Sequence, residues 1–349
     1  MLHVEANSYP LYHSPEEVAM NPTDLHRLQL LAGNAQALKK EFAWHNVSAS
    51  RLAALLWAVE DRTAAPESIR GMFDRIKQSA SAFSSFRGLL SVALSAVLSL
   101  REDPEGRLNE TMDIYEQMRD LKFKSSDYLV FAAFEIAENA EPARRAEAIE
   151  RTRMFYEGMK ANHRFLTSQD DYIFSALLGL SELPTESTLK RMEQFYAELK
   201  PEFRAGNGLQ ALTHVLVLGE ADAGTIPRMM ELRDRLKERK LRMDKDFTLP
   251  SLGLLALLPT DTRVIVDDIE QGFSYLREQK GFGRWSITEQ ELLLLVSGVV
   301  ISRSVGQIRE SVASPAVSNM LMSLVAAQQA VMIATIVAMT AASAAASSS

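Results

Sequence analysis

The stretch Tyr115–Ala137 decides the fold and reads YEQMRDLKFKSSDYLVFAAFEIA. An apolar and a basic residue, Met118-Arg119, stand three residues after an aromatic one, in a segment with the spacing of an amphipathic helix. From Tyr128 onward the stretch is apolar on nearly every side, which predicts a helix covered by several neighbours. Two serines precede Asp127 and mark the start of this second helix. The stretch therefore predicts a hairpin of one amphipathic helix (A) and one buried helix (B).

The same pattern recurs along the chain at steps of 38, 42, 41, 40, 37 and 40 residues. The apolar–basic pairs are Leu38-Lys39, Ile76-Lys77, Met118-Arg119, Met159-Lys160, Leu199-Lys200, Leu236-Lys237 and Leu276-Arg277. An apolar segment follows each pair, and a proline separates successive units, at Pro66, Pro104, Pro142, Pro184, Pro227 and Pro259. Proline is tolerated in the first turn of a helix and breaks a helix interior, so these prolines mark unit boundaries.

The sequence therefore predicts an all-α fold of about seven helical hairpins of roughly 40 residues. They would stack as an α-solenoid or as a compact superhelix whose B helices face inward, followed by a C-terminal apolar helix. We expect an N-terminal extension at 1–22, the repeat domain at 23–302, and an uncharged helix and tail at 303–349. Ser286, with Glu289 three residues later, predicts a capping box at the last B helix.

Composition narrows the function classes. The 349 residues carry a net charge of −7, which argues against a nucleic-acid partner, because such proteins gain affinity through Lys and Arg. There are no cysteines, so thiolate metal sites and cysteine nucleophiles are excluded. Their absence fits a reducing compartment, and we expect a cytoplasmic protein. Phosphate-cradling glycine loops, dinucleotide turns and serine-hydrolase elbows lack sequence support, and no cofactor is predicted.

Histidines offer few metal ligands. None of the six stands at a spacing that places two imidazoles on one helix face. His163, with Asp170 and Asp171, is the weak metal candidate, although aspartates at a helix start usually act as caps. His214 lies in an apolar B helix, where a structural role, hydrogen bonded in the core, is the expected one and catalysis the alternative.

Acidic residues recur where the B helices end. The catalytic candidates are Glu60, Glu102, Glu138, Glu182 and Glu220. Carboxylates gathered at one rim could perform the acid–base chemistry of a hydrolase if the hairpins closed into a ring. The competing interpretation is that they favour the positive end of the next A helix.

Parts of the chain resemble a bacterial family of all-helical proteins that is known only as a domain of unknown function. The resemblance lies in Leu38-Lys39-Lys40-Glu41-Phe42-Ala43-Trp44, in Leu52-Ala53-Ala54-Leu55-Leu56-Trp57 and in the uncharged Ala/Ser-rich end. It implies a helical fold and a cytoplasmic bacterial setting. It supplies no catalytic residue, substrate or cofactor.

The function predicted from these observations is a non-enzymatic module that binds a protein or peptide on its repeat surface. The alternatives are a hydrolase that uses the B-helix carboxylates, and a membrane-associated protein anchored by its C-terminal segment. The 17 residues Ala330–Ala346 are uncharged, at the short limit for a membrane span. We expect instead that about Pro315–Thr340 forms a helix that covers the last hairpin or pairs with its copy in a homodimer.

Overall fold

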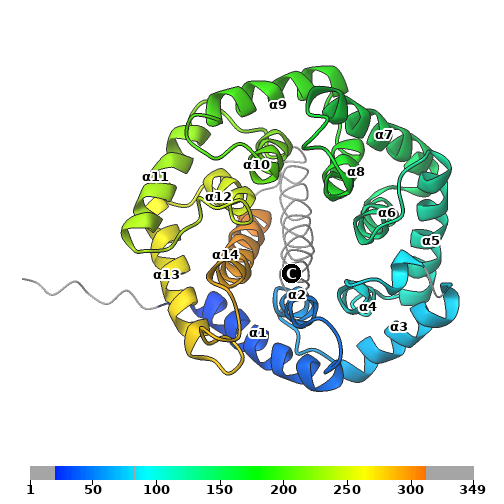
Figure 1. Ribbon diagram of the computed structural model, residues 1–349. Helices are drawn as coiled ribbons and strands as arrows, with labels where there is room; N and C mark the ends of the chain where they lie inside the picture. The colour runs from blue at the N-terminus through cyan, green and yellow to red at the C-terminus, as the bar shows by residue number, and fades with distance from the viewer. Residues whose placement is uncertain (1–19, 82–83, 312–349) are drawn as a thin grey trace, which may run out of the picture.

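The computed structural model describes residues 20–81 and 84–311, with side chains to residue 304. The described residues contain fourteen α-helices and no strand, so the all-α prediction is confirmed. Figure 1 shows that the odd-numbered helices form an outer layer around the even-numbered ones, so outer and inner helices alternate along the chain. Each outer helix and the inner helix that follows it form one of the predicted hairpins.

The outer helices are the amphipathic ones. They are α1 (Pro22–Glu41), α3 (Pro66–Ser79), α5 (Pro104–Asp120), α7 (Arg145–Asn162), α9 (Thr185–Leu199), α11 (Thr225–Glu238) and α13 (Thr262–Glu278). In α9 the buried apolar residues Met192, Phe195 and Leu199 follow the helical repeat, while the other side of the helix faces solvent. Pro66 and Pro104 occupy the first position of α3 and α5, as expected of proline at a helix start.

The inner helices form the core. They are α2 (Val47–Ala58), α4 (Ser91–Leu98), α6 (Asp127–Asn139), α8 (Tyr172–Leu180), α10 (Asn207–Leu218), α12 (Leu249–Leu257) and α14 (Glu289–Ser311). Every residue of α4 is buried. The inner helices therefore supply most of the apolar contact area that stabilises the fold.

The first and last hairpins meet, because α1 packs against both α13 and α14. Arg51 of α2 lies 3.0 Å from Glu291 of α14, and both side chains are buried. Arg303 of α14 likewise contacts Asp24 of α1 at 3.3 Å. Seven hairpins thus close into a ring, and buried ion pairs join its two ends.

Helix starts were predicted with one error. Ser126 caps α6 as expected, since its hydroxyl accepts from the backbone N–H of Leu129 at 3.2 Å. The capping box predicted at Ser286 is wrong, because Thr288 caps α14 by accepting from the N–H of Glu291 at 3.1 Å. Ser286 instead lies in the preceding turn, where its carbonyl accepts from Arg51 at 2.6 Å.

No helix in the described ranges is both long and apolar enough to span a lipid bilayer. The proposed tail helix at Pro315–Thr340 and the uncharged stretch Ala330–Ala346 lie outside the described residues, as does most of the predicted extension at 1–22.

Candidate functional site on the loop face

The hairpin topology gives the ring two different faces. The connections from outer to inner helices lie on one face, which we call the loop face; they span residues 42–46, 80–90, 121–126, 163–171, 200–206, 239–248 and 279–288. The return connections, from inner to outer helices, lie on the opposite face, which we call the return face; they span residues 59–65, 99–103, 140–144, 181–184, 219–224 and 258–261. Side-chain hydrogen bonds join neighbouring loop-face connections, for example Ser85 to Ser125 at 2.7 Å and Asn207 to Asp170 at 3.1 Å.

The two faces differ in charge. The loop-face connections contain twelve basic residues, Arg87, Lys122, Lys124, Arg164, Lys200, Arg204, Arg239, Lys240, Arg242, Lys245, Lys280 and Arg284, against five acidic ones, Asp170, Asp171, Glu202, Asp244 and Asp246. The return connections contain nine acidic residues, Glu60, Asp61, Glu102, Asp103, Glu141, Glu182, Glu220, Asp222 and Asp261, against three basic ones, Arg62, Arg101 and Arg144. An acidic protein therefore presents one basic face.

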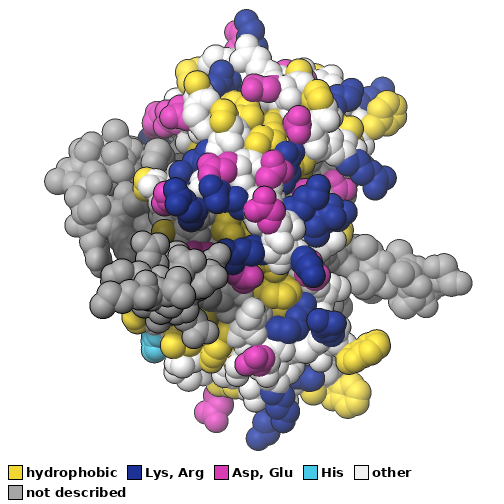
Figure 2. Space-filling model, turned by 90° about the vertical axis from the view of Figure 1, so that its left-hand side faces the viewer, with side chains coloured by type: hydrophobic (Ala, Val, Ile, Leu, Met, Phe, Trp, Pro, Cys, Tyr) yellow, Lys and Arg dark blue, Asp and Glu magenta, His cyan; other side chains and the backbone are white. Residues whose placement is uncertain are grey.

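Three aromatic side chains project from this basic face. Trp44, Phe165 and Trp285 are 98%, 99% and 103% exposed, and all three lie in loop-face connections. In Figure 2, hydrophobic side chains stand out beside Lys and Arg at the right-hand edge of the molecule. Trp57, by contrast, is buried in the core, and its indole N–H donates to the carbonyl of Ala96 at 3.0 Å. The exposed aromatics contribute no such packing to the fold.

These aromatics are widely spaced around the ring. Trp44 and Trp285 belong to the first and last hairpins, which are neighbours, whereas Phe165 follows α7 on the far side of the ring. A surface that contacts all three must be broad. Sequence reasoning missed them, although an aromatic residue within a predicted connection was a usable signal, because a turn that packs against nothing is usually polar.

The histidine and aspartate candidates meet at the start of α8. Asp171 is buried, and its carboxylate accepts from the backbone N–H of Ser168 at 2.9 Å, which makes it a capping residue. His214 Nδ1 lies 3.7 Å from Asp171 Oδ1 and has no hydrogen-bond partner in the described chain. The sequence named both residues without pairing them.

Burial dominates the ionisation of this pair. It raises the pKa of Asp171 well above its usual range, and the nearby Asp170 raises it further. Burial, together with the charge of His163, lowers the pKa of His214 to about 3. The imidazole is therefore neutral at physiological pH.

The metal candidates lie apart. His163 Nε2 is 3.0 Å from Glu193, and the His163 ring packs on Tyr196 with centroids 4.4 Å apart. Asp170 instead hydrogen bonds to Asn207. Within the part of the chain that the structure describes, no three His, Asp or Glu residues are grouped as a metal ion would need.

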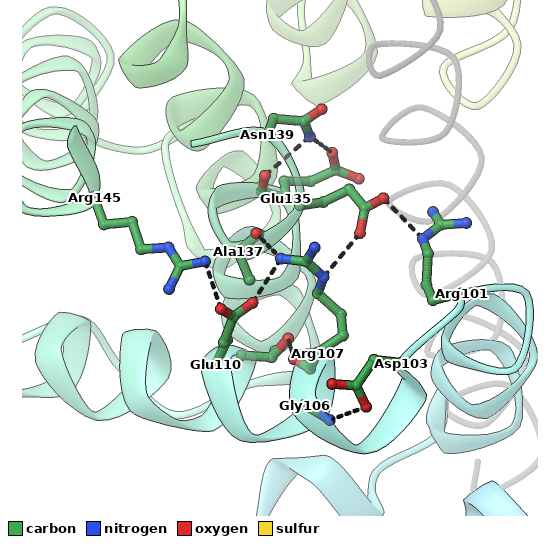
Figure 3. A network of polar contacts seen from close by, with 11 residues as sticks. Arg101, Asp103, Gly106, Arg107, Glu110, Glu135, Ala137, Asn139 and Arg145 are labelled. Atoms are coloured by element: carbon green, nitrogen blue, oxygen red, sulfur yellow. Dashed lines mark hydrogen bonds and ion pairs between the residues drawn. The ribbon is translucent and has the colours of Figure 1, made fainter. Parts of the chain in front are cut away.

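The five glutamate candidates lie near the return face without converging on one another. Glu138 contacts Arg101 at 2.8 Å and Arg107 at 3.2 Å; both arginines are labelled in Figure 3. Glu182 lies 3.0 Å from Arg144, while Glu60 and Glu102 are exposed. Glu220 lines a pocket of about 250 Å³ whose other walls are largely apolar.

One carboxyl group of note was not predicted. Glu135 of α6 is 2% exposed, and its Oε2 accepts from the side-chain amide of Asn139 at 3.0 Å. Its Oε1 has no hydrogen-bond partner in the described chain. Burial, together with the neighbouring Glu138, raises the pKa of Glu135 to about 8. No sequence signal separates Glu135 from the other acidic residues of the inner helices.

Comparison with known proteins places these features in a family. A family described as "Protein of unknown function (DUF4003)" matches residues 34–330. The uncharacterized protein YeaA of Bacillus subtilis is 23% identical over 188 residues, which cover 52% of this chain and 57% of that protein. The match therefore spans little more than half the length of that relative. No solved structure matches the chain.

Proposed function

This chain belongs to the DUF4003 family, and we propose that it is a non-enzymatic interaction module that binds an acidic protein partner through its loop face. One observation carries the proposal. Trp44, Phe165 and Trp285 are fully exposed on the loop face, whose seven connections together contain more Lys and Arg than Asp and Glu.

Exposed aromatics favour binding on energetic grounds. A Trp or Phe side chain buries about 150–250 Å² when it is covered, and such residues dominate the energetics of protein interfaces. In the free protein these three rings gain none of that energy. A partner that covers them would gain it, so the same residues that leave the fold unaffected would govern affinity.

The charge of the loop face indicates the chemistry of the partner. Basic connections around the aromatics would attract an acidic surface and speed the encounter, while the acidic return face would repel it. The partner would therefore bind one face of the ring in one orientation. The spacing of the aromatics around the ring favours a folded domain over a single short peptide.

The proposal also includes the arrangement of the hairpins, the role of the C-terminal segment and the cellular location. We take the seven hairpins as a solenoid of repeats that closes on itself and holds the loop-face connections in one rigid frame. The segment from about Pro315 to Thr340 would cover the last hairpin or pair with its copy in a homodimer. A cytoplasmic location fits the absence of cysteine.

Photocrosslinking in the native cell tests the proposal. A benzoylphenylalanine residue is placed at Phe165 or Trp285, and the matched control carries it at the exposed Glu182 of the return face. We expect the two loop-face positions to crosslink to the same protein, which should be acidic, and the control position not to. Crosslinking that is absent at the loop face, or equal at Glu182, would refute the proposal.

A further inference from the structure

A second feature of the loop face is a pocket of about 490 Å³ beside the connection from α7 to α8. Its volume lies within the roughly 300–1,000 Å³ range of small-molecule sites. Lys124, Lys160 and Arg164 line it, together with Tyr128 and Tyr156. The sequence contains no glycine-rich phosphate loop, so only the fold brings these side chains together.

The three cations come from three different segments. Lys124 lies in the connection before α6, Lys160 in the last turn of α7, and Arg164 in the connection after α7. No carboxylate among the described residues lies within ion-pair distance of any of them. This contrasts with the outer surface, where Arg153 pairs with Glu150 and Arg144 with Glu147. Three positive charges without a carboxylate partner at one pocket favour the binding of an anionic ligand.

The walls of the pocket are fixed by packing. The Tyr172 hydroxyl accepts from the backbone N–H of Lys124 at 3.0 Å. The rings of Tyr156 and Tyr172 meet edge to face with centroids 4.8 Å apart. The backbone of Lys124 is therefore anchored on the inner helix α8, which fixes the point from which its side chain extends.

One carboxylate lines the pocket, and its oxygens are already engaged. Asp170 accepts from the hydroxyl of Ser168 with one oxygen and from the amide of Asn207, at 3.1 Å, with the other. Tyr128 supplies a neutral donor, because burial and the nearby aspartates hold its pKa above the usual range. The positive charges thus outnumber the negative charge in the pocket.

We propose that this pocket binds the phosphate group of a phosphate monoester, with Lys124, Lys160 and Arg164 as its cationic ligands. Such a group carries a charge of about −1.5 to −2 at neutral pH, which the excess of basic over acidic side chains matches. Arginine and lysine donors to phosphate form charge-assisted hydrogen bonds, among the strongest that proteins make. The proposal is independent of the protein partner proposed above.

Two sources could supply this group: a soluble metabolite, or a lipid headgroup at a membrane surface. Phe165 is the next residue after Arg164 and is fully exposed, so a ring able to enter the bilayer interface stands beside the pocket. Both sources present the same phosphate chemistry, and they differ in whether Phe165 takes part.

Calorimetric titration of the full chain tests the pocket. sn-Glycerol 3-phosphate is the soluble probe, with glycerol as the neutral control. Vesicles of phosphatidylcholine with and without phosphatidic acid form the lipid arm. We expect phosphate-dependent binding in at least one arm. If the lipid is the source, Phe165→Ser weakens vesicle binding; if the source is soluble, the same substitution leaves binding unchanged.

Charge-neutralising variants decide whether the phosphate-dependent binding takes place in this pocket. Lys124→Gln and Arg164→Gln should each weaken binding about tenfold. Lys122→Gln is the matched control, since Lys122 lies on the same connection, is exposed and does not line the pocket. The three substituted side chains are exposed, and unchanged thermal unfolding would verify that the variants fold. No binding in either arm, or an equal loss with Lys122→Gln, would overturn the proposal.

Discussion

At the scale of single residues, the ionisation of Glu135 links the stability of the fold to pH. Its carboxyl group is buried and has one oxygen without a partner, so the folded protein favours the protonated form. Its pKa of about 8 lies above the ordinary value of 4.5 that applies in the unfolded chain. Between these two values the folded state binds one proton more, so the free energy of unfolding decreases as the pH rises.

Glu135→Gln removes this dependence while keeping a side chain that can donate and accept. At pH 5 both proteins should have similar stability. At pH 8 the variant should be more stable by about 2–4 kcal/mol, an order-of-magnitude figure. Guanidinium unfolding at pH 5, 6.5 and 8 measures the difference, with the exposed Glu141→Gln as control. Parallel stability profiles for wild type and Glu135→Gln would show that Glu135 is ionised in the fold.

Residue-level reasoning from the sequence identified the right groups but not their partners. His214 and Asp171 were both singled out, yet their contact at 3.7 Å depends on the packing of α10 against α8, 43 residues apart along the chain. Glu138 was chosen for its place at a helix end, and the two arginines that neutralise it come from other segments, Arg101 from the connection before α5 and Arg107 from α5. Partners set by tertiary packing leave no local signal.

At the scale of secondary structure elements, local signals were sufficient. The apolar–basic pair at Met118-Arg119 and the apolar run from Tyr128 placed α5 and α6, because helical periodicity is a property of neighbouring residues. The capping residue of α14 was misassigned because Ser286 and Thr288 both precede the helix. The choice between them depends on Arg51, which binds the Ser286 carbonyl from another hairpin.

Thr288→Ala tests the assignment of this cap. The loss of a side-chain acceptor for the Glu291 N–H should lower the free energy of unfolding by about 1 kcal/mol. Ser286→Ala is the matched control, since Arg51 uses its backbone carbonyl and the hydroxyl is dispensable; we expect a change below about 0.5 kcal/mol. Urea denaturation of both variants measures the effect. If Ser286→Ala lowered the free energy of unfolding more than Thr288→Ala does, the result would support the capping box at Ser286 instead.

Gly179 tests how closely α7 and α8 pack, and Gly33 of α1 is its control. A Cβ on Gly179 would lie 2.5 Å from Thr152 Oγ1 and 2.8 Å from the carbonyl oxygen of Ala148, so α8 would have to move away from α7. We expect Gly179→Ala to destabilise by about 1–3 kcal/mol. A Cβ on Gly33 of α1 meets nothing within 4 Å, and Gly33→Ala should stabilise by about 0.5–1 kcal/mol. Thermal unfolding should therefore shift in opposite directions, and shifts of the same sign would contradict the packing.

At the scale of the whole molecule, the sequence predicted the all-α fold but not the closure of the ring. An open stack and a closed one share the same hairpin, so the repeat alone cannot distinguish them. Closure is visible only in contacts between the ends, such as Arg51 with Glu291, which are 240 residues apart. The basic loop face likewise arises only when seven separate connections, none strongly charged alone, are brought to one side.

The Arg51–Glu291 pair allows this closure to be measured. Arg51 also donates to the carbonyls of Ser286 at 2.6 Å and Gly281 at 3.1 Å, so its guanidinium joins α2 to the last hairpin. Arg51→Met leaves the buried Glu291 carboxylate unpaired, which should cost about 3–5 kcal/mol of stability. Adding Glu291→Leu removes that unpaired charge and should recover part of the loss. Guanidinium unfolding of the two single variants and the double variant forms the cycle.

The control for this cycle is an ion pair within a single helix, which does not connect the two ends of the ring. Arg153 and Glu150 belong to the same outer helix, α7, and both are partly exposed at its surface, so Arg153→Ala should change stability by less than about 1 kcal/mol. If closure holds the molecule together, Arg51→Met should also expose the first and last hairpins to hydrogen exchange before the hairpins opposite them. Uniform exchange around the ring, with additive single and double variants, would mean that the seven hairpins are stable without the contact that closes them.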